Sequence, residues 1–207
     1  MDKGYHLVLM SYWRTAAEWF VSYLKKNNVK KIAYIMNANK RNYIANPDYR
    51  MYDLESYQQA GFDVTVVDLD ELDKTPNIFD DVDLVYVRGG NTFDILDAAR
   101  RSGFDKLLAQ LLERGVLYAS SSAGSILVAP NIEIAENDFA PDYNLVGLKD
   151  TAGLSCVDFA VFPHWEERWQ EELNKLKEAK KVTYPIRCLT DRQVLIVKDG
   201  KEKIIEL

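Results

Sequence analysis

The sequence predicts an α/β protein, a three-layer sandwich with a mostly parallel β-sheet between layers of helices and a C-terminal β-hairpin. Apolar runs of strand type alternate along the chain with amphipathic stretches of helical period. Residues 31–36 are rich in Ile, Ala and Tyr, which is typical of a strand in a sheet covered on both faces. Asp199-Gly200 separates two apolar runs and signals a tight hairpin turn, which places an antiparallel pair at the edge of the sheet.

The individual elements follow from the same patterns. We expect strands at 5–10, 31–36, 62–69, 84–87, 116–120 and 159–162. We expect helices at 13–27, 49–60, 93–101, 104–113 and 123–128, and a helical stripe from Trp165 to Leu176. Residues 37–47 contain three asparagines before position 45 and are expected to form a polar loop. Because no internal repeat or linker interrupts this pattern, residues 1–207 are expected to form one domain.

Composition excludes several classes of protein. The chain has 207 residues, of which 47% are hydrophobic and 28% charged, so it is not intrinsically disordered. A net charge of −6 and a pI near 5.1 argue against nucleic acid as a partner. We find neither a signal peptide nor an apolar run that could span a bilayer, so a cytoplasmic location without membrane contact is expected. The 12 tyrosines and 4 tryptophans would fit either a homodimer face or the core.

The cysteines and histidines do not suggest a metal site. The chain contains only two of each, Cys156, Cys188, His6 and His164, and no Cys-x-x-Cys pair. Nothing in their spacing indicates a structural zinc site or a disulfide scaffold. We therefore expect no metal.

The strongest local signal is segment 116–125, in which an apolar strand meets a turn of small residues and then a helix. Ser120, Ser122 and Gly124 have the spacing of a nucleophile elbow, with Ser in place of the first Gly. The positions on either side must be small, because strand and helix pass closely there. The strained turn would expose the Ser122 hydroxyl above the sheet, beside unpaired N–H groups of the helix start. The alternative is that these serines only cap the helix.

A serine nucleophile needs a base and an orienting acid. His164 follows an apolar run at the carboxyl end of an expected strand, the same edge as Ser122, whereas His6 lies within the first strand run and is expected to be a core or terminal residue. Residue spacing does not choose among the acids between Ser122 and His164. These are Glu133, Glu136, Asp138, Asp142, Asp150 and Asp158.

A second segment, 88–92, also ends a strand and begins a helix. Gly89 and Gly90 would let the backbone approach a ligand and aim N–H groups at an anion, and Asn91 or Thr92 could cap the helix. One interpretation is an oxyanion hole for acyl transfer. The other is a phosphate or nucleotide loop, against which the absence of the Walker and Gly-x-Gly-x-x-Gly patterns weighs.

With these segments in this order, the chain resembles the peptidase E family of serine peptidases, which includes aspartyl dipeptidases and the more distant cyanophycinases. The resemblance covers essentially the whole chain. It is carried by Gly-Gly-Asn-Thr-Phe at 89–93, by 118–125 around Ser-Ala-Gly, and by Phe-Pro-His at 162–164. It implies a class I glutamine-amidotransferase-like (flavodoxin-like) sandwich, in which a serine on a strand–helix elbow replaces the amidotransferase cysteine.

The resemblance also implies catalytic roles. Ser122 would be the nucleophile and His164 the base. The family acid follows an Asn shortly after the elbow helix, which favours Asp138 with about one inserted residue, ahead of Glu136 and Glu133.

The resemblance further implies how substrate is held. One oxyanion donor would come from Gly90 or Gly89 and the other from the Ala123 N–H. Aspartyl dipeptidases hold the acidic side chain of the substrate with an arginine after the histidine. The expected substrate-binding residues are Asn91, Thr92, Arg168 and Arg187.

The expected function is a serine peptidase that acts on small peptides, releases an N-terminal aspartate and needs no cofactor. Arg88, Ser121 and Ser125 depart from the family pattern beside the nucleophile and alter the border of the pocket. Two other functions stay open. One is a small-ester hydrolase of α/β-hydrolase type, for which the chain is short. The other is a binding or regulatory homologue that kept the fold without turnover.

Overall fold

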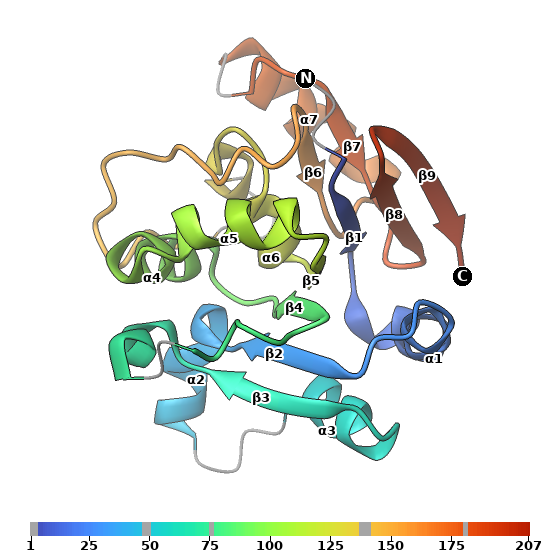
Figure 1. The fold of residues 1–207 in the computed structure, drawn as a ribbon. Coiled ribbons are helices and arrows are strands. Elements are labelled where there is room, and N and C mark those ends of the chain that lie inside the picture. Colours follow the sequence, from blue (N-terminus) through green and yellow to red (C-terminus); the bar gives the residue numbers. More distant parts are fainter. Residues whose placement is uncertain (1–3, 47–50, 75–76, 137–141, 180–181) are drawn as a thin grey trace.

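A sheet of seven strands organises the protein. The structure is a computed structural model that describes residues 4–46, 51–74, 77–136, 142–179 and 182–207. The strand order is β3-β2-β4-β5-β1-β8-β9. The strands are β1 (His6–Met10), β2 (Lys31–Ile35), β3 (Asp63–Val67), β4 (Leu84–Val87), β5 (Leu117–Ser121), β8 (Gln193–Lys198) and β9 (Lys201–Glu206). The strands from β3 to β1 are parallel, whereas β8 and β9 form an antiparallel edge (Figure 1).

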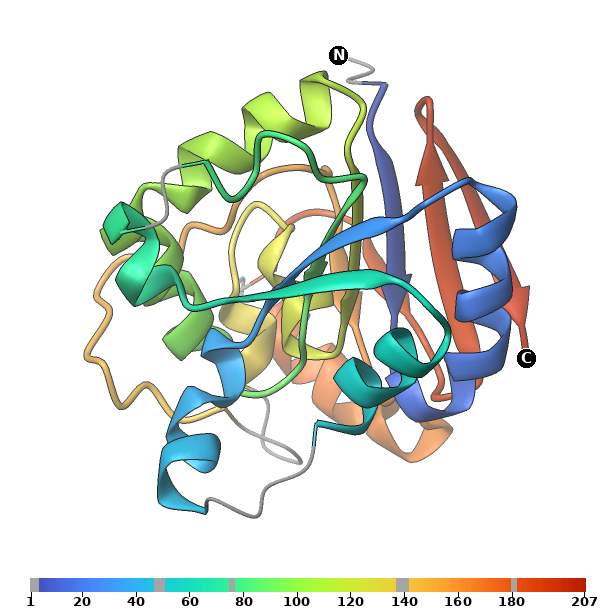
Figure 2. The same cartoon turned by 60° about the horizontal axis from the view of Figure 1, so that its bottom comes forward.

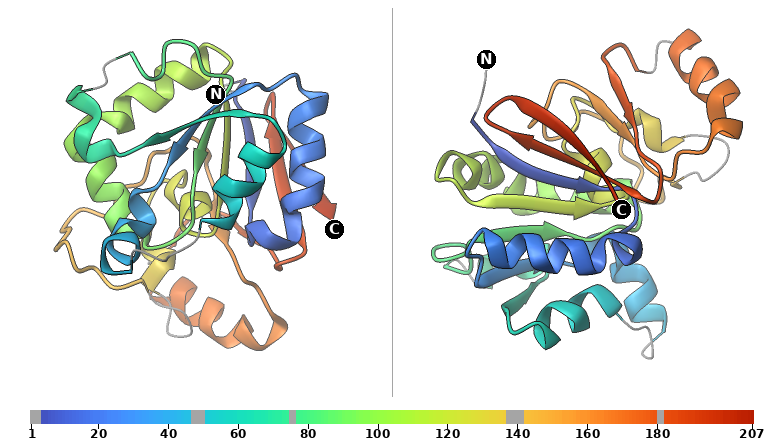
Figure 3. Two further views of the ribbon diagram at one scale, coloured as in Figure 1. Left: turned by 90° about the horizontal axis from the view of Figure 1, so that it is seen from below. Right: turned by 90° about the vertical axis from the view of Figure 1, so that its right-hand side faces the viewer.

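Helices lie on both sides of this sheet (Figures 2 and 3). The helices are α1 (Trp13–Lys26), α2 (Lys40–Ala45), α3 (Tyr52–Gln59), α4 (Thr92–Ser102), α5 (Phe104–Glu113), α6 (Ala123–Leu127) and α7 (Gln170–Glu178). Alternate residues of β2 enter two separate cores, because side chains of a strand point to opposite faces. Ala33 and Ile35 pack with α4, α5 and α6, whereas Ile32 and Tyr34 pack with α1 and α3.

The predicted fold class is confirmed, and the C-terminal hairpin is confirmed in detail. Strands β8 and β9 pair along their whole length, and β8 pairs in turn with β1. Asp199 and Gly200 have φ values of 51° and 70°, the left-handed pair that a two-residue hairpin turn requires.

The prediction of a polar loop at 37–47 is wrong. Residues Asn37–Asn39 form a 3₁₀ turn that leads into helix α2. The asparagines are used in tertiary hydrogen bonds instead. Asn37 Oδ1 accepts from the Leu69 N–H at 2.9 Å, and Asn39 Nδ2 donates to the Gly89 carbonyl oxygen.

A short strand escaped prediction. Strand β7 (Ile186–Cys188) pairs in parallel with β6 (Ala160–Phe162) in a second, two-stranded sheet. All three of its residues are half-buried and they form no apolar run, so no periodicity marks them. In the described part of the chain, no helix is long and apolar enough to cross a membrane.

Phe20 offers a test of the packing between α1 and the sheet. Its side chain is fully buried, and its ring lies 6.0 Å from that of Tyr57 and 6.4 Å from that of Tyr86. Phe20→Ala is expected to lower the free energy of unfolding by about 3–5 kcal/mol in urea denaturation, because it leaves a cavity between helix and sheet. Glu18→Ala, on the exposed side of the same helix, should change it by less than about 0.5 kcal/mol. Equal effects of the two variants would contradict this packing.

Candidate active site

The turn between β5 and α6 is a strained elbow centred on Ser122. Ser122 has φ 48° and ψ −114°, outside the regions that a serine ordinarily occupies. Its N–H donates to the carbonyl oxygens of Met10 and Ser11, at 3.0 and 3.2 Å, which ties the turn to the end of β1. A Cβ at position 124 would lie 2.5 Å from the Val87 carbonyl oxygen and 2.9 Å from Ser120 Cβ. This close approach explains why the positions around the elbow must be small.

His164 and Asp191 complete a chain of hydrogen bonds from Ser122. His164 Nε2 lies 3.0 Å from Ser122 Oγ, and His164 Nδ1 lies 2.6 Å from Asp191 Oδ1. His164 lies two residues after β6, a strand of the second, two-stranded sheet, and has a φ of 56°. Asp191 lies in the segment between β7 and β8. This arrangement can move a proton from the hydroxyl to an imidazole that a carboxylate orients.

The other histidine lies elsewhere. His6 is on β1, where its Nε2 is 2.6 Å from the Tyr23 hydroxyl oxygen. Burial lowers the pKa of His6, which favours a neutral ring. The sequence-based choice of His164 over His6 therefore agrees with the geometry at Ser122.

The acid on His164 is not among those the sequence analysis considered. Asp138 lies outside the described residues. Glu133 accepts a hydrogen bond from Thr151 Oγ1 at 3.0 Å, and Glu136 is exposed at the end of the same 3₁₀ turn, Glu133–Glu136. The acids expected from the sequence lie between Ser122 and His164, whereas Asp191 follows His164 in the chain. The sequence marks Asp191 only as an acidic residue two positions before the first hairpin strand.

The Gly89-Gly90 turn packs against the elbow. Gly90 has a φ of 149°, and a Cβ there would lie 2.1 Å from the Ala38 carbonyl oxygen, so only glycine fits. A Cβ on Gly89 would lie 3.0 Å from Ser122 Cβ. The Gly89 N–H already donates to Ser121 Oγ at 3.1 Å, which corrects its assignment as an oxyanion donor. Among the hydrogen bonds of the described residues, none uses the N–H of Gly90 or Ala123.

Asn91 and Thr92 hold this turn in place, which corrects their assignment to substrate binding. Asn91 Oδ1 caps α4 by accepting from the N–H groups of Phe93 and Asp94. Thr92 is fully buried and donates from both its N–H and its hydroxyl to Asp142 Oδ2. Burial raises the pKa of the Asp142 carboxyl, and the two Thr92 bonds partly oppose this effect.

Arg168 and Arg187 do not line the cavity beside Ser122, which corrects the second part of that assignment. Arg168 is exposed, pairs with Glu166 at 2.6 Å and lies over the Trp169 ring. Arg187 pairs with Glu202 at 2.6 Å and covers the Phe159 ring. Both guanidinium groups are therefore engaged away from the nucleophile.

A cavity of about 390 Å³ lies beside the nucleophile. Its lining residues are Ser11, Tyr12, Trp13, Arg14, Asn39, Tyr52, Asp53, Arg88, Gly89, Gly90, Ser121, Ser122 and His164. It holds two arginines that the sequence analysis did not assign to substrate.

The two arginines of the cavity differ in how their charge is compensated. Arg88 Nε lies 3.1 Å from Asp53 Oδ2, and both side chains are mostly buried. The Arg14 guanidinium lies over the Tyr52 ring at 5.3 Å. Within the described ranges, Arg14 forms no ion pair with a carboxylate. Counting only partners in the described part of the chain, the cavity wall therefore carries one positive charge without a carboxylate partner.

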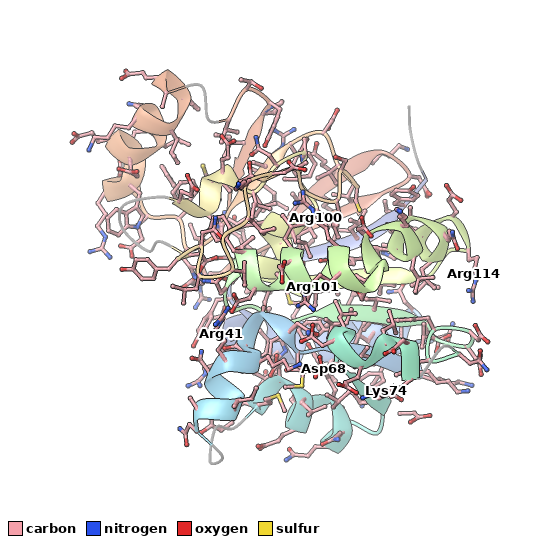
Figure 4. All side chains as sticks on the ribbon, turned by 90° about the vertical axis from the view of Figure 1, so that its left-hand side faces the viewer. Arg41, Asp68, Lys74, Arg100, Arg101 and Arg114 are labelled. Carbon is pink, nitrogen blue, oxygen red and sulfur yellow. The ribbon has the colours of Figure 1, made fainter. Side chains whose placement is uncertain are left out.

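Several charged side chains outside the cavity form ion pairs with one another. Arg41 and Asp68 lie on the face shown in Figure 4. Arg41 pairs with Asp94, and Lys40 lies 2.7 Å from Asp68 and 2.5 Å from Asp70. Within the described residues, no cluster of three or more His, Cys, Asp or Glu side chains could hold a metal ion.

Comparison with known proteins identifies the family and agrees with the fold. The chain matches the model of peptidase family S51 over residues 7–205 and therefore belongs to that family of peptidases. It is 28% identical over 209 residues to an uncharacterized peptidase of Pasteurella multocida, with 96% of each chain covered. It is 29% identical over 86 residues to peptidase E of Escherichia coli, which covers 42% of this chain and 35% of that protein.

Solved structures show the same fold. A crystal structure of a Listeria monocytogenes protein assigned to peptidase E superposes with a TM-score of 0.78 at 23% identity, over 98% of both chains. A peptidase from an acI-B1 actinobacterium superposes with a TM-score of 0.68 at 15% identity, over 98% of this chain and 87% of that one.

Proposed function

We propose that the protein is a serine peptidase that cleaves small peptides and releases an N-terminal aspartate. The observation that carries the proposal is the hydrogen-bonded series Ser122–His164–Asp191, on a strained elbow beside a cavity, in a chain of peptidase family S51. No metal or organic cofactor is needed for this chemistry.

The proposed reaction begins with proton transfer. Nδ1–H of His164 donates to Asp191, which leaves Nε2 to accept the proton of Ser122 Oγ as that oxygen attacks the scissile carbonyl carbon. Imidazolium then donates the proton to the leaving amine, and the peptide bond breaks. Water, activated by the same imidazole, hydrolyses the acyl-enzyme and restores Ser122.

The negative charge on the tetrahedral oxygen needs donors. The N–H groups of Gly90 and Ala123 are the candidates, because Gly90 lines the same cavity as Ser122, Ala123 follows Ser122 directly, and the Gly89 N–H is bound to Ser121. Loss of one such donor typically costs about 3–4 kcal/mol of transition-state stabilisation.

Arg14 supports the preference for an acidic residue. Arg14 lines the same cavity as Ser122. Its guanidinium lies over the Tyr52 ring and pairs with no carboxylate of the described residues, whereas the charge of Arg88 is compensated by Asp53. A substrate carboxylate would form a charge-assisted hydrogen bond with this guanidinium.

Ser122→Ala tests the nucleophile. The variant is expected to fold like the parent and to lose at least about 10³-fold in kcat on a dipeptide library, because it lacks the hydroxyl that would form the acyl-enzyme. A fluorophosphonate probe should label the parent at Ser122 and leave the variant unlabelled. The library digest and intact-mass labelling measure the two outcomes.

Three results would contradict the proposal. Parental dipeptide turnover by Ser122→Ala would remove the nucleophile. A parent that hydrolyses small esters and no dipeptide would be an esterase. A parent that neither turns over nor reacts with the probe would be a silent homologue of the family.

Asp191→Asn tests the acid. The variant is expected to lower kcat by about 10³- to 10⁴-fold, because an amide does not stabilise the imidazolium or fix its tautomer. Asp138→Asn is the matched comparison, since the resemblance favours Asp138, and it should retain most of the parental kcat. The opposite ranking of the two variants would transfer the role to Asp138.

Arg14→Gln tests the substrate preference. We expect kcat/KM on Asp-Xaa dipeptides to fall by about 10- to 100-fold, as for loss of a hydrogen bond between charged groups worth about 1.5–3 kcal/mol, and kcat/KM on Ala-Xaa dipeptides to stay within about threefold. Arg168→Gln is the control, because its guanidinium pairs with Glu166 outside the cavity. An equal loss on both substrate classes, or a loss in the control alone, would refute the role of Arg14.

A further inference from the structure

Ser11 lies where the three segments of the proposed site meet. It follows β1 directly, and β1 pairs with β5 on one side and with β8 on the other. Ser122 extends from the end of β5, and Asp191 lies two residues before β8. The end of β1 is therefore held between the nucleophile and the acid, and Ser11 is fully buried there.

The Ser11 hydroxyl makes two hydrogen bonds, and both reach proposed catalytic residues. It accepts from the His164 backbone N–H at 2.7 Å and donates to Asp191 Oδ1 at 2.9 Å. The same carboxylate oxygen contacts His164 Nδ1 at 2.6 Å. The Ser11 hydroxyl thus connects the His164 backbone to the Asp191 carboxylate, and that carboxylate contacts the His164 imidazole. The three contacts form a closed cycle.

The chemistry of a hydroxyl sets the direction of these bonds. A serine hydroxyl has one proton and two lone pairs. The His164 N–H must use a lone pair, so the single proton is available for Asp191. The hydroxyl therefore links the backbone N–H of His164 to the carboxylate of Asp191, as acceptor of one bond and donor of the other.

This connection matters because His164 has a left-handed backbone. Its φ of 56° is uncommon for a residue other than glycine and persists only where the surroundings impose it. The bond from its N–H to Ser11 is one such constraint, because it fixes the peptide plane from which the imidazole projects toward Ser122.

We propose that Ser11 is a positioning residue of the active site, whose hydroxyl locks the backbone of His164 and the carboxylate of Asp191 into the arrangement that aims the imidazole at Ser122. The proposal rests on the proposed function for its catalytic consequence. Its structural part, the coupling of Ser11 to the ring of His164, is measurable without turnover.

The test compares Ser11→Ala with the parent by two readouts. kcat on the preferred dipeptide is expected to fall by about 10- to 100-fold with KM within about threefold, because displacement of a reacting group by about 1 Å costs on the order of 10²-fold. The pKa of His164 is expected to be higher in Ser11→Ala than in the parent, because Asp191 loses a donor and its charge then favours the imidazolium more strongly.

Nuclear magnetic resonance can read that pKa directly. The chain has only two histidines, so a His6→Gln variant assigns the two ring signals. The groups that face His164 are Asp191, the Tyr12 ring at a centroid distance of 6.1 Å, and Asp142, whose carboxyl interacts with it electrostatically. Ser11→Ala replaces none of these groups, and of the three only Asp191 loses a hydrogen bond. Thr15 Oγ1 still donates to the Asp191 carbonyl oxygen and holds the acid near its place.

Two further variants separate positioning from packing. Ser125 is also fully buried, and its hydroxyl donates to the carbonyl oxygen of Met10, the residue before Ser11. Ser125→Ala should therefore lower stability without changing the pKa of His164. Ser11→Cys fills the site with a weak donor and should give a kcat and a pKa between those of the parent and Ser11→Ala.

The outcomes are distinct. Parental kcat and an unchanged His164 pKa in a folded Ser11→Ala would overturn the proposal, as would equal shifts in Ser125→Ala. If Ser11→Ala does not fold, Ser11→Cys decides by the same two measurements. If the parent itself hydrolyses no peptide, the proposed function fails, and the His164 pKa alone then tests the role of Ser11.

Discussion

The site depends on how closely the ends of β4 and β5 approach each other. Gly124 faces the Val87 carbonyl oxygen with no room for a Cβ, and Gly89 and Gly90 meet Ser122 and Ala38 in the same way. The backbone at these glycines therefore lies close to the strained turn that carries the Ser122 hydroxyl. A side chain at Gly124 or Gly89 would push the elbow away from the end of β4 and from the Gly-Gly turn, and a side chain at Gly90 would push that turn away from Ala38. The carboxyl ends of β4 and β5 thereby lie together at the candidate active site.

Much of the fold could be predicted from the sequence, because buried strands and amphipathic helices carry strong periodic signals. Ser122 could be predicted as well, because it directly follows β5 at a turn of small residues, and His164 could be predicted because it closely follows a strand. The common sheet edge expected for the two residues was wrong, since β6 lies in the second, two-stranded sheet. Asp191 could not be predicted: it lies on a segment without periodicity, and only the pairing of β8 with β1 brings it to His164. The loop expected at 37–47 failed because buried asparagines there serve tertiary contacts.

The pocket shows how a change beside the nucleophile is accommodated. Arg88 stands where the resemblance to aspartyl dipeptidases leads one to expect a glycine, and a buried guanidinium needs a counter-charge. Asp53 on α3 provides it, and Asp53 also accepts from the Tyr86 hydroxyl at 3.3 Å. Tyr86 OH lies 3.2 Å from Ser121 Oγ, which holds the Gly89 N–H. The Arg88–Asp53 pair thus supports the glycine turn through Tyr86 and Ser121. Arg14 contributes the second positive charge of the cavity wall.

The place of Asp191 in the chain has a consequence for biosynthesis. Ribosomes make proteins from the amino terminus, and segments fold as they emerge. The serine and the imidazole leave the ribosome first, but the carboxylate and the strand that anchors it against β1 come afterwards. A nascent chain therefore carries a hydroxyl without an oriented base until translation has passed the hairpin. The hydrogen-bonded arrangement of Ser122, His164 and Asp191 can therefore form only after β8 has been synthesised and has paired with β1.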